Sequence, residues 1–275
     1  MLDFIKVVIL GIVEGITEWL PVSSTGHLIL VGSVLKPGLS DAFMEMFDVV
    51  IQLGAIMAVV VLYFHKLNPF SPRKSERQKM LSWQMWIKVA IASVPAAIVG
   101  LLFNDYLDAI FYKPVPVAIM LIVYGVLFII IEDKHRGKQP KVTRISQLTL
   151  KMLLWIGAFQ MLALIPGTSR SGATIVGALI IGVSREVAAE FTFFLAIPVM
   201  FGASALKLIK FGFHFTAAEF GFLMLGCVVS FGMSVIAIKF LMNYIKKNDF
   251  KVFGYYRIIL GALIILVALF KMLLG

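Results

Sequence analysis

The chain has 275 residues, of which 60% are hydrophobic and only 15% are charged. Soluble domains average about 45–50% apolar and about 25% charged residues, so this composition excludes a water-soluble globule and indicates a protein embedded in a bilayer. The net charge of +10 would suggest nucleic-acid binding in a soluble protein. In a membrane protein, loop charges that orient the helices explain it better, and no nucleic-acid partner is predicted.

Two apolar regions of the chain are each interrupted by a polar loop. The first covers residues 4–34 and is broken after Pro21, and the second covers residues 152–183 and is broken after Pro166. Each region predicts two half-helices joined by a loop that contains Pro and Gly, which together form a re-entrant helical hairpin. Six further apolar runs are long enough to cross a hydrocarbon core of about 30 Å: residues 49–64, 89–103, 114–131, 191–206, 220–238 and 258–274.

The interrupted regions occupy equivalent places in two halves of the chain. Pro21 and Pro166 are 145 residues apart, and three long apolar runs follow each of them. We therefore predict an all-α polytopic membrane protein, a single domain made of two repeats at about 1–131 and 145–275. Because three spans per half is an odd number, the second repeat must be inverted relative to the first. Paired interruptions in an inverted repeat indicate a site near the bilayer midplane.

The basic residues predict the orientation of the protein in the membrane. Of the 25 Lys and Arg residues, 18 lie in segments that this layout places on one side: Lys66–Lys88, Lys134–Lys151, Arg185 and Lys239–Arg257. The positive-inside rule assigns that side to the cytoplasm. Both termini and the first hairpin then face outward. The second hairpin enters from the cytoplasmic side, so that the two tips can meet.

Three charged residues lie inside the interrupted regions. Glu14 and Glu18 are four residues apart and project from one helical face, while Arg170 lies in the second loop. Each such charge costs about 2.5–3.5 kcal/mol near the bilayer centre on insertion scales, so these residues need partners, a water-filled cavity, or both. A buried ion pair that only locks the hairpins together is the simpler alternative. The nearby Ser, Thr and His residues favour a functional polar cavity.

The loops of the two hairpins are typical of an anion site. Each loop leads into a new helix, whose unpaired N–H groups and positive dipole end would point into the membrane interior. The candidate residues are Ser23, Ser24 and Thr25 in the first loop and Ser169, Arg170 and Ser171 in the second. Ser23 and Ser171 could instead serve only as helix N-caps. The planar guanidinium of Arg170 suits phosphate oxygens.

Two further polar residues belong to the candidate site. His27 could exchange protons or act as a nucleophile. Gln52 lies within an apolar run and is either a supporting residue of the site or an interhelical hydrogen bond. The residues alone thus predict a midplane site for an anion such as phosphate, and they leave an enzyme and a transporter or flippase equally open.

The motifs themselves resemble those of a known family. The stretches Glu14–His27 (EGITEWLPVSSTGH) and Pro166–Thr174 (PGTSRSGAT) closely resemble the two signature motifs of bacterial undecaprenyl-diphosphate phosphatases of the bacitracin-resistance type. The resemblance covers the whole chain, including Phe47–Gly54 (FDVVIQLG). It implies release of inorganic phosphate from a C55 polyprenyl diphosphate, which yields the monophosphate that carries cell-wall precursors. It also implies a plasma-membrane protein whose site opens outward and depends on a divalent cation, Mg²⁺ or Ca²⁺.

The resemblance also implies roles for individual residues. The acid motif of the family maps onto Glu14 and Glu18, which we expect to hold the cation. We expect Ser24 to be the nucleophile, Glu18 and His27 to be an acid/base pair and Arg170 to stabilise the transferred phosphoryl group; attack by water or by His27 stays open. The expected substrate-binding residues are Ser23, Thr25, Ser169, Ser171, Thr174 and Gln52. The expected partners are the polyprenyl diphosphate and membrane lipid, and a homodimer is left open.

Overall fold

The fold is all-α and contains six long apolar helices. The computed structural model describes residues 2–35, 38–111, 113–212 and 214–274, and no strand occurs in these ranges. Six of its helices are long and apolar enough to cross a membrane: α3 (Asp41–Leu62), α5 (Glu76–Phe111), α6 (Pro114–His135), α9 (Arg185–Phe211), α10 (Ala217–Tyr244) and α11 (Lys251–Leu274). The predicted fold class and the six spans are therefore confirmed. Each of these helices extends beyond its apolar run at one or both ends, because polar turns continue it past the hydrocarbon region.

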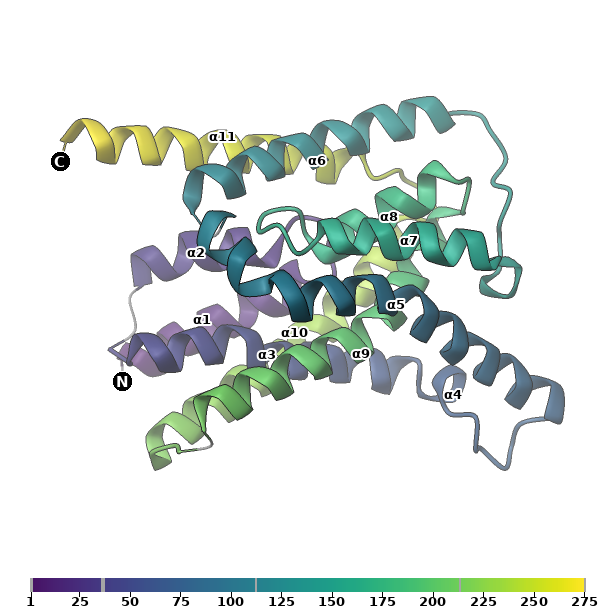
Figure 1. The fold of residues 1–275 in the computed structure, drawn as a ribbon, viewed down its shortest axis with the longest axis horizontal. Coiled ribbons are helices and arrows are strands. Elements are labelled where there is room, and N and C mark those ends of the chain that lie inside the picture. Colours follow the sequence, from purple (N-terminus) through teal and green to yellow (C-terminus); the bar gives the residue numbers. More distant parts are fainter. Residues whose placement is uncertain (1, 36–37, 112, 213, 275) are drawn as a thin grey trace.

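Shorter helices form the two interrupted regions. α1 (Leu2–Thr17) packs on α2 (Ser24–Leu35), and α7 (Leu150–Leu162) packs on α8 (Arg170–Ile180). Figure 1 shows that the α1–α2 hairpin enters from the end where both termini lie, whereas α7–α8 enters from the opposite end. The two loops meet near the middle of the molecule. This arrangement supports the predicted re-entrant hairpins. The remaining elements are α4 (Phe64–Leu67) and a 3₁₀ turn at Ile145–Gln147.

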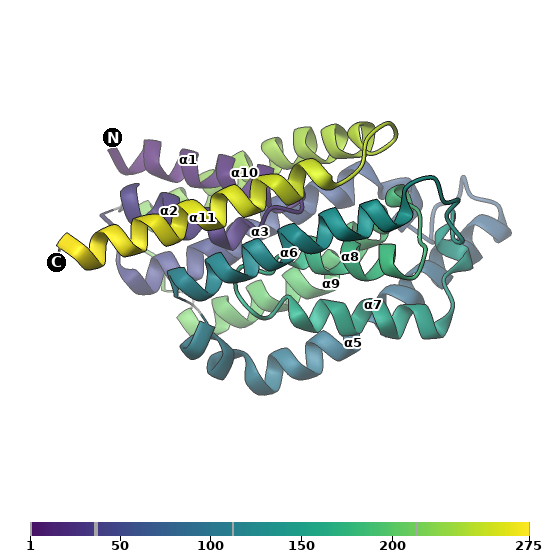
Figure 2. The ribbon, with the colours of Figure 1, turned by 90° about the horizontal axis from the view of Figure 1, so that it is seen from above.

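The helices pack in a pattern that recurs in the two halves. α1 packs on α10, and α7 packs on α5. Because α7 is the counterpart of α1 and α10 is the counterpart of α5, these two contacts are equivalent in the two halves. α3 packs on its counterpart α9, and α6 lies along its counterpart α11, as both Figure 1 and Figure 2 show. This pairing supports the predicted inverted repeat, whose boundaries at about 1–131 and 145–275 stay a prediction.

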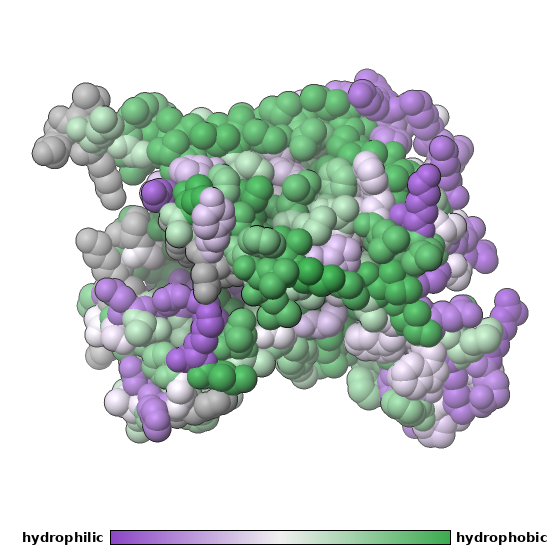
Figure 3. All heavy atoms as spheres, in the orientation of Figure 1, coloured by the Kyte–Doolittle hydropathy of each residue, from purple (hydrophilic) through white to green (hydrophobic). Residues whose placement is uncertain are grey.

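The surface divides into an apolar middle and polar ends. In Figure 3 apolar side chains cover the upper edge and the middle of the visible face, and polar side chains gather at the right-hand end and the lower left. Helix α5 shows why, since Ile98, Leu101 and Leu102 are all more than half exposed. In water such exposure would be unfavourable, but in a bilayer these side chains contact lipid.

Close helix crossings depend on glycines. Gly54 of α3 lies against the backbone of α10, and a Cβ at this position would fall far inside van der Waals contact with the Cys227 carbonyl oxygen. Gly15 of α1 crosses α10 in the same manner, with a Cβ position 2.5 Å from the Ser230 carbonyl oxygen. Small residues at such crossings let membrane helices approach closely, which is the main source of their packing energy.

Gly54→Ala is therefore expected to lower the free energy of unfolding by about 1–3 kcal/mol, because the added methyl must force α3 and α10 apart. The measurement is the thermal unfolding midpoint of the detergent-purified protein. Gly232→Ala is the matched control, since Gly232 also lies in α10 but has open space around its Cβ position. Equal midpoints for the two variants would contradict the expected role of Gly54.

Candidate active site

Both hairpin loops end in a serine with an unusual backbone conformation. Ser23 has φ of 74° and Ser169 has φ of 71°, and among the described residues they are the only non-glycine residues with positive φ. The Ser23 hydroxyl oxygen accepts a hydrogen bond from the Gly26 N–H at 3.3 Å, and Ser169 accepts one from Gly172 at 3.2 Å. Both serines thus cap the helices that follow them. Matched backbone strain in two facing loops is typical of a functional site.

Glu18 joins the two hairpins through its two carboxylate oxygens. The Ser24 hydroxyl donates to Oε2 of Glu18 at 2.7 Å, and Nη2 of Arg170 donates to Oε1 at 3.0 Å. Glu18 and Ser24 are both buried, so this ion pair and this hydrogen bond are shielded from water. The arrangement confirms that charges from the two interrupted regions meet. It places a carboxylate in position to take the Ser24 proton, with a guanidinium beside it.

Arg170 is held in place by Glu18 and by two further residues. Its Nη1 donates to the Thr192 carbonyl oxygen of α9 at 2.9 Å, and its guanidinium carbon lies 5.9 Å from the ring centroid of Trp19. Its Nε is buried and has no hydrogen-bond partner in the described part of the chain. Because a buried N–H without a partner is unfavourable, this donor is available to an incoming anion.

The side chains of Ser171 and Thr174, which follow Arg170 in the chain, form hydrogen bonds within the protein. Ser171 Oγ lies 3.1 Å from the Glu18 carbonyl oxygen and donates to it, so Ser171 is not an N-cap and instead ties the two loops together. Thr174 Oγ1 donates to the Arg170 carbonyl oxygen at 2.9 Å and lies 2.8 Å from Thr192 Oγ1. Both residues, predicted to bind substrate, here hold Arg170 and its loop in position.

Three predicted residues lie outside this network. His27 has its two ring nitrogens beside the Ser23 carbonyl and the Tyr256 hydroxyl rather than beside Ser24. Thr25 and Gln52 are partly buried, and neither side chain makes a hydrogen bond with any residue that the structure describes. The proposed roles of these three residues therefore stay predictions.

Glu14 is the predicted residue with the least satisfied environment. It is fully buried, and neither of its carboxylate oxygens has a hydrogen-bond partner among the described residues. Oδ1 of Asp48, on α3, is in the same situation. In the described ranges, no group of three or more His, Cys, Asp and Glu side chains is arranged to hold a metal. Unpartnered carboxylate oxygens nevertheless suit a hard divalent cation in donor chemistry, because such ions bind oxygen ligands.

Arg257 corrects one expectation from the sequence. It was counted among the cytoplasmic loop charges, but it is fully buried and lies six residues inside α11. Its Nη2 donates to the carbonyl oxygens of Gly167 and Thr168, both at 2.8 Å, and its Nη1 donates to the Pro21 carbonyl oxygen at 3.2 Å. One guanidinium therefore binds the backbone of both hairpin loops. The sequence did contain a signal that Arg257 lies inside a helix: no turn-forming residue separates it from the apolar run that follows.

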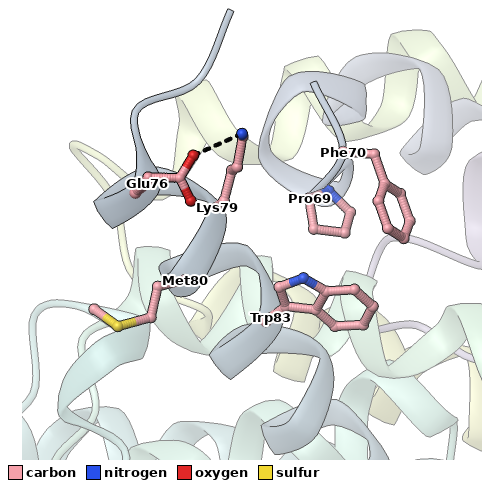
Figure 4. A pocket seen from close by; sticks show the side chains of 6 residues that line it. All are labelled: Pro69, Phe70, Glu76, Lys79, Met80 and Trp83. Carbon is pink, nitrogen blue, oxygen red and sulfur yellow. Dashed lines mark hydrogen bonds and ion pairs between the residues drawn. The ribbon is translucent and has the colours of Figure 1, made fainter. Parts of the chain in front are cut away.

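Two cavities of the structure lie away from the hairpin tips. One of about 490 Å³ opens beside the first turns of α5. Figure 4 shows Trp83 and Phe70 on one side of it and the Glu76–Lys79 ion pair on the other. This region lies at the end of the molecule opposite the termini in Figure 1. The hairpin tips themselves are closed by the Glu18–Arg170 contact.

Comparison with known proteins agrees with the motifs. Residues 7–263 match the family model of the bacitracin resistance protein BacA. The chain belongs to this family. A relative from Enterococcus faecalis named undecaprenyl-diphosphatase is 63% identical over 263 residues, which cover 94% of this chain and 95% of the relative. A protein of the same name from Acetivibrio thermocellus is 62% identical over 266 residues, covering 97% and 98%.

The similarity to BacA proteins extends over the whole site. A third protein named undecaprenyl-diphosphatase, from Lactococcus lactis subsp. lactis, is 57% identical in an alignment that covers 100% of both chains. The family match contains both hairpin loops and also Arg257. The family resemblance that the two motifs indicated is therefore confirmed.

Proposed function

We propose that this chain hydrolyses undecaprenyl diphosphate to undecaprenyl phosphate and inorganic phosphate, and that Ser24 is the attacking nucleophile. The reaction returns the lipid carrier to cell-wall synthesis, which is consistent with bacitracin resistance as a property of the BacA family. The observation that carries the site assignment is the position of Glu18, whose two carboxylate oxygens contact the Ser24 hydroxyl and the Arg170 guanidinium.

The first chemical step follows from these contacts. Glu18 takes the proton of the Ser24 hydroxyl as the oxygen attacks the terminal phosphorus of the diphosphate. A Ser24–phosphorus bond forms, the bond from that phosphorus to the bridging oxygen breaks, and undecaprenyl phosphate leaves. Glu18 passes this first proton to the departing undecaprenyl phosphate and is a carboxylate again. Water then attacks the phosphoserine and gives a proton to Glu18, which returns it to the Ser24 oxygen as the serine–phosphorus bond breaks and inorganic phosphate is released. We propose His27 as the second proton-transfer group of this cycle.

Hydrogen-bond donors that can stabilise the charge developing on the transferred phosphoryl group are already in place. Arg170 offers its unpartnered Nε–H, and it can turn its Nη2 from Glu18 to phosphate once Glu18 is protonated. The first N–H groups of α2 and α8 lie where the two loops meet, because each loop ends at a helix N-terminus. Arg257 fixes both loops through their carbonyl oxygens, so these donors need little reorganisation during the reaction.

A divalent cation is the remaining component of the proposal. Glu14 and Glu18 would hold it, because Glu14 has two buried oxygens without partners and lies one helical turn from Glu18. Bound there, the cation would offset the repulsion between the glutamates and the diphosphate. Asp48 Oδ1 is a further oxygen that such a cation could satisfy.

The decisive experiment is phosphate release by the protein purified in detergent. Because no second compartment exists in detergent, the enzyme releases inorganic phosphate from undecaprenyl diphosphate, whereas a transporter or flippase does not. Removal of divalent cations with a chelator is expected to suppress release, and added Mg²⁺ or Ca²⁺ is expected to restore it. Glu14→Gln should raise the cation concentration needed for half-maximal activity. Full activity after exhaustive chelation would exclude the cation from the mechanism.

The site is proposed to open to the extracytoplasmic side. The first hairpin enters from the end that carries both termini, and the basic segments after α3 and α6 lie at the other end, as the positive-inside rule requires for a cytoplasmic face. A transporter or flippase is the second candidate function, and the entry of the two hairpins from opposite ends is the feature that favours it. A homodimer stays an expectation.

A further inference from the structure

His27 has two partners, and neither belongs to the Glu18–Ser24–Arg170 group. Its Nδ1 lies 2.7 Å from the Ser23 carbonyl oxygen, and its Nε2 lies 2.7 Å from the Tyr256 hydroxyl oxygen. The two rings stack with their planes 7° apart and their centroids 5.6 Å apart. Tyr256 belongs to α11, so the last helix of the chain contacts the first hairpin at this residue.

The contact with the Ser23 carbonyl selects one tautomer of the imidazole, and the contact with Tyr256 gives the other ring nitrogen a partner. A carbonyl oxygen only accepts hydrogen bonds, so the Nδ1 beside Ser23 carries a proton. In the neutral ring Nε2 then holds the lone pair, and the Tyr256 hydroxyl donates to it. A hydroxyl can also accept, so the same group can receive the Nε2–H after His27 takes a proton. Tyr256 thus provides a partner for both protonation states.

The position of Tyr256 is itself fixed by its neighbour in the chain. Arg257 follows it in α11 and binds the carbonyl oxygens of both hairpin loops. The turn of α11 that carries Tyr256 is therefore held at a defined distance from the first hairpin. Tyr256 is 46% exposed and His27 only 9%, so the hydroxyl is the outer partner of a buried ring.

We propose that Tyr256 is a positioning residue, which binds the basic Nε2 of His27 and keeps it in one orientation, while the Ser23 carbonyl keeps the proton on Nδ1. This inference rests on the proposed function, because it assigns His27 a proton-transfer role there. It adds a second residue of α11, next to Arg257, to a site built mainly from the two hairpins and α9. Tyr256 need not contact the substrate to act in this way.

The test uses Tyr256→Phe in the full-length protein in detergent. This variant keeps the stacked ring and removes only the hydroxyl. In spectra of ¹⁵N-histidine-labelled protein, the His27 signals are identified by their loss in His27→Gln. We expect the parent protein to show Nδ1 protonated and Nε2 unprotonated but hydrogen-bonded. Tyr256→Phe should keep this tautomer, because the Ser23 contact remains, and should shift the Nε2 signal to that of a lone pair without a hydrogen bond.

Kinetic measurements complete the test. Loss of one positioning hydrogen bond is expected to lower kcat roughly ten-fold while KM stays within about two-fold. Tyr255→Phe is the matched control, because Tyr255 is the adjacent exposed tyrosine of α11, and it should keep the parent kcat and the parent Nε2 signal. The melting temperature should be the same for both variants.

Two outcomes would overturn the inference. One is a Tyr256→Phe protein whose His27 spectrum equals that of the parent. The other is a fall in kcat that accompanies a lower melting temperature without a shift of the Nε2 signal, since this would make Tyr256 a packing residue only. Failure of the proposed function gives a different result, in which His27→Gln keeps the parent turnover while Tyr256→Phe still shifts the Nε2 signal of His27.

Discussion

Arg170→Lys is expected to lower turnover at saturating substrate by about 10²–10³-fold, although the charge is retained. Loss of one donor to a developing oxyanion typically costs this much, about 2.7–4 kcal/mol. The guanidinium binds Glu18 and the Thr192 carbonyl at once and still has a free Nε–H. A lysine ammonium is a point charge on a flexible stem and cannot reproduce this planar set of donors.

The measurement for Arg170→Lys is kcat from phosphate release, with Arg185→Lys as the matched control. Arg185 also uses its planar fork, through Nε and Nη2 to both oxygens of Glu132, but at the end of the molecule opposite the termini. We expect Arg185→Lys to reduce stability while the folded protein keeps its turnover. Near-normal turnover of Arg170→Lys would remove Arg170 from the central phosphate role.

Ser24→Ala is expected to abolish turnover while substrate binding survives, because the nucleophile is lost but the phosphate donors stay in place. Rapid-quench experiments with labelled substrate should trap a transient phosphoserine in the parent protein. Ser234→Ala is the control for loss of a buried serine hydroxyl, since Ser234 donates to the Gly15 carbonyl oxygen in the α1–α10 contact. It should remain active.

Two results would assign the attack on phosphorus to another group. An acid-labile phosphohistidine would identify His27 as the nucleophile. Absence of any phosphoenzyme, together with Ser24→Ala activity above about a tenth of the parent, would indicate direct attack by water. A factor of ten corresponds to only about 1.4 kcal/mol of barrier, which a lost positioning hydrogen bond can explain.

The fold was largely predictable because the bilayer imposes simple lengths on the chain. Apolar runs of sufficient length become spans, and the Pro-containing interruptions after Pro21 and Pro166 become hairpin loops. The helix ends were less predictable. Helix α5 begins at Glu76 rather than near residue 89, because polar residues continue a helix beyond the hydrocarbon, where hydropathy carries no information about helix length.

The site was predictable only where a charge had to be compensated inside the membrane. Glu18 and Arg170 fall in this class, and the structure pairs them. Arg257 looked like a loop charge because it lies at the edge of an apolar run, and only the start of α11 at Lys251 places it in the interior. Tyr256 and Thr192 are neutral residues in apolar helices, so their role depends on which helices become neighbours.

The separation of Glu18 and Arg170 along the chain affects how the protein is made. Their contact joins residues 152 positions apart, and at about 5–20 residues per second a ribosome needs roughly 8–30 s to synthesise the chain between them. During this interval the first hairpin has no guanidinium partner for Glu18, and Arg257 is synthesised later still. We expect the newborn hairpin to stay near the water-facing edge of the bilayer, or with the insertion machinery, and to sink to its final depth only after nearly the whole chain has been translated.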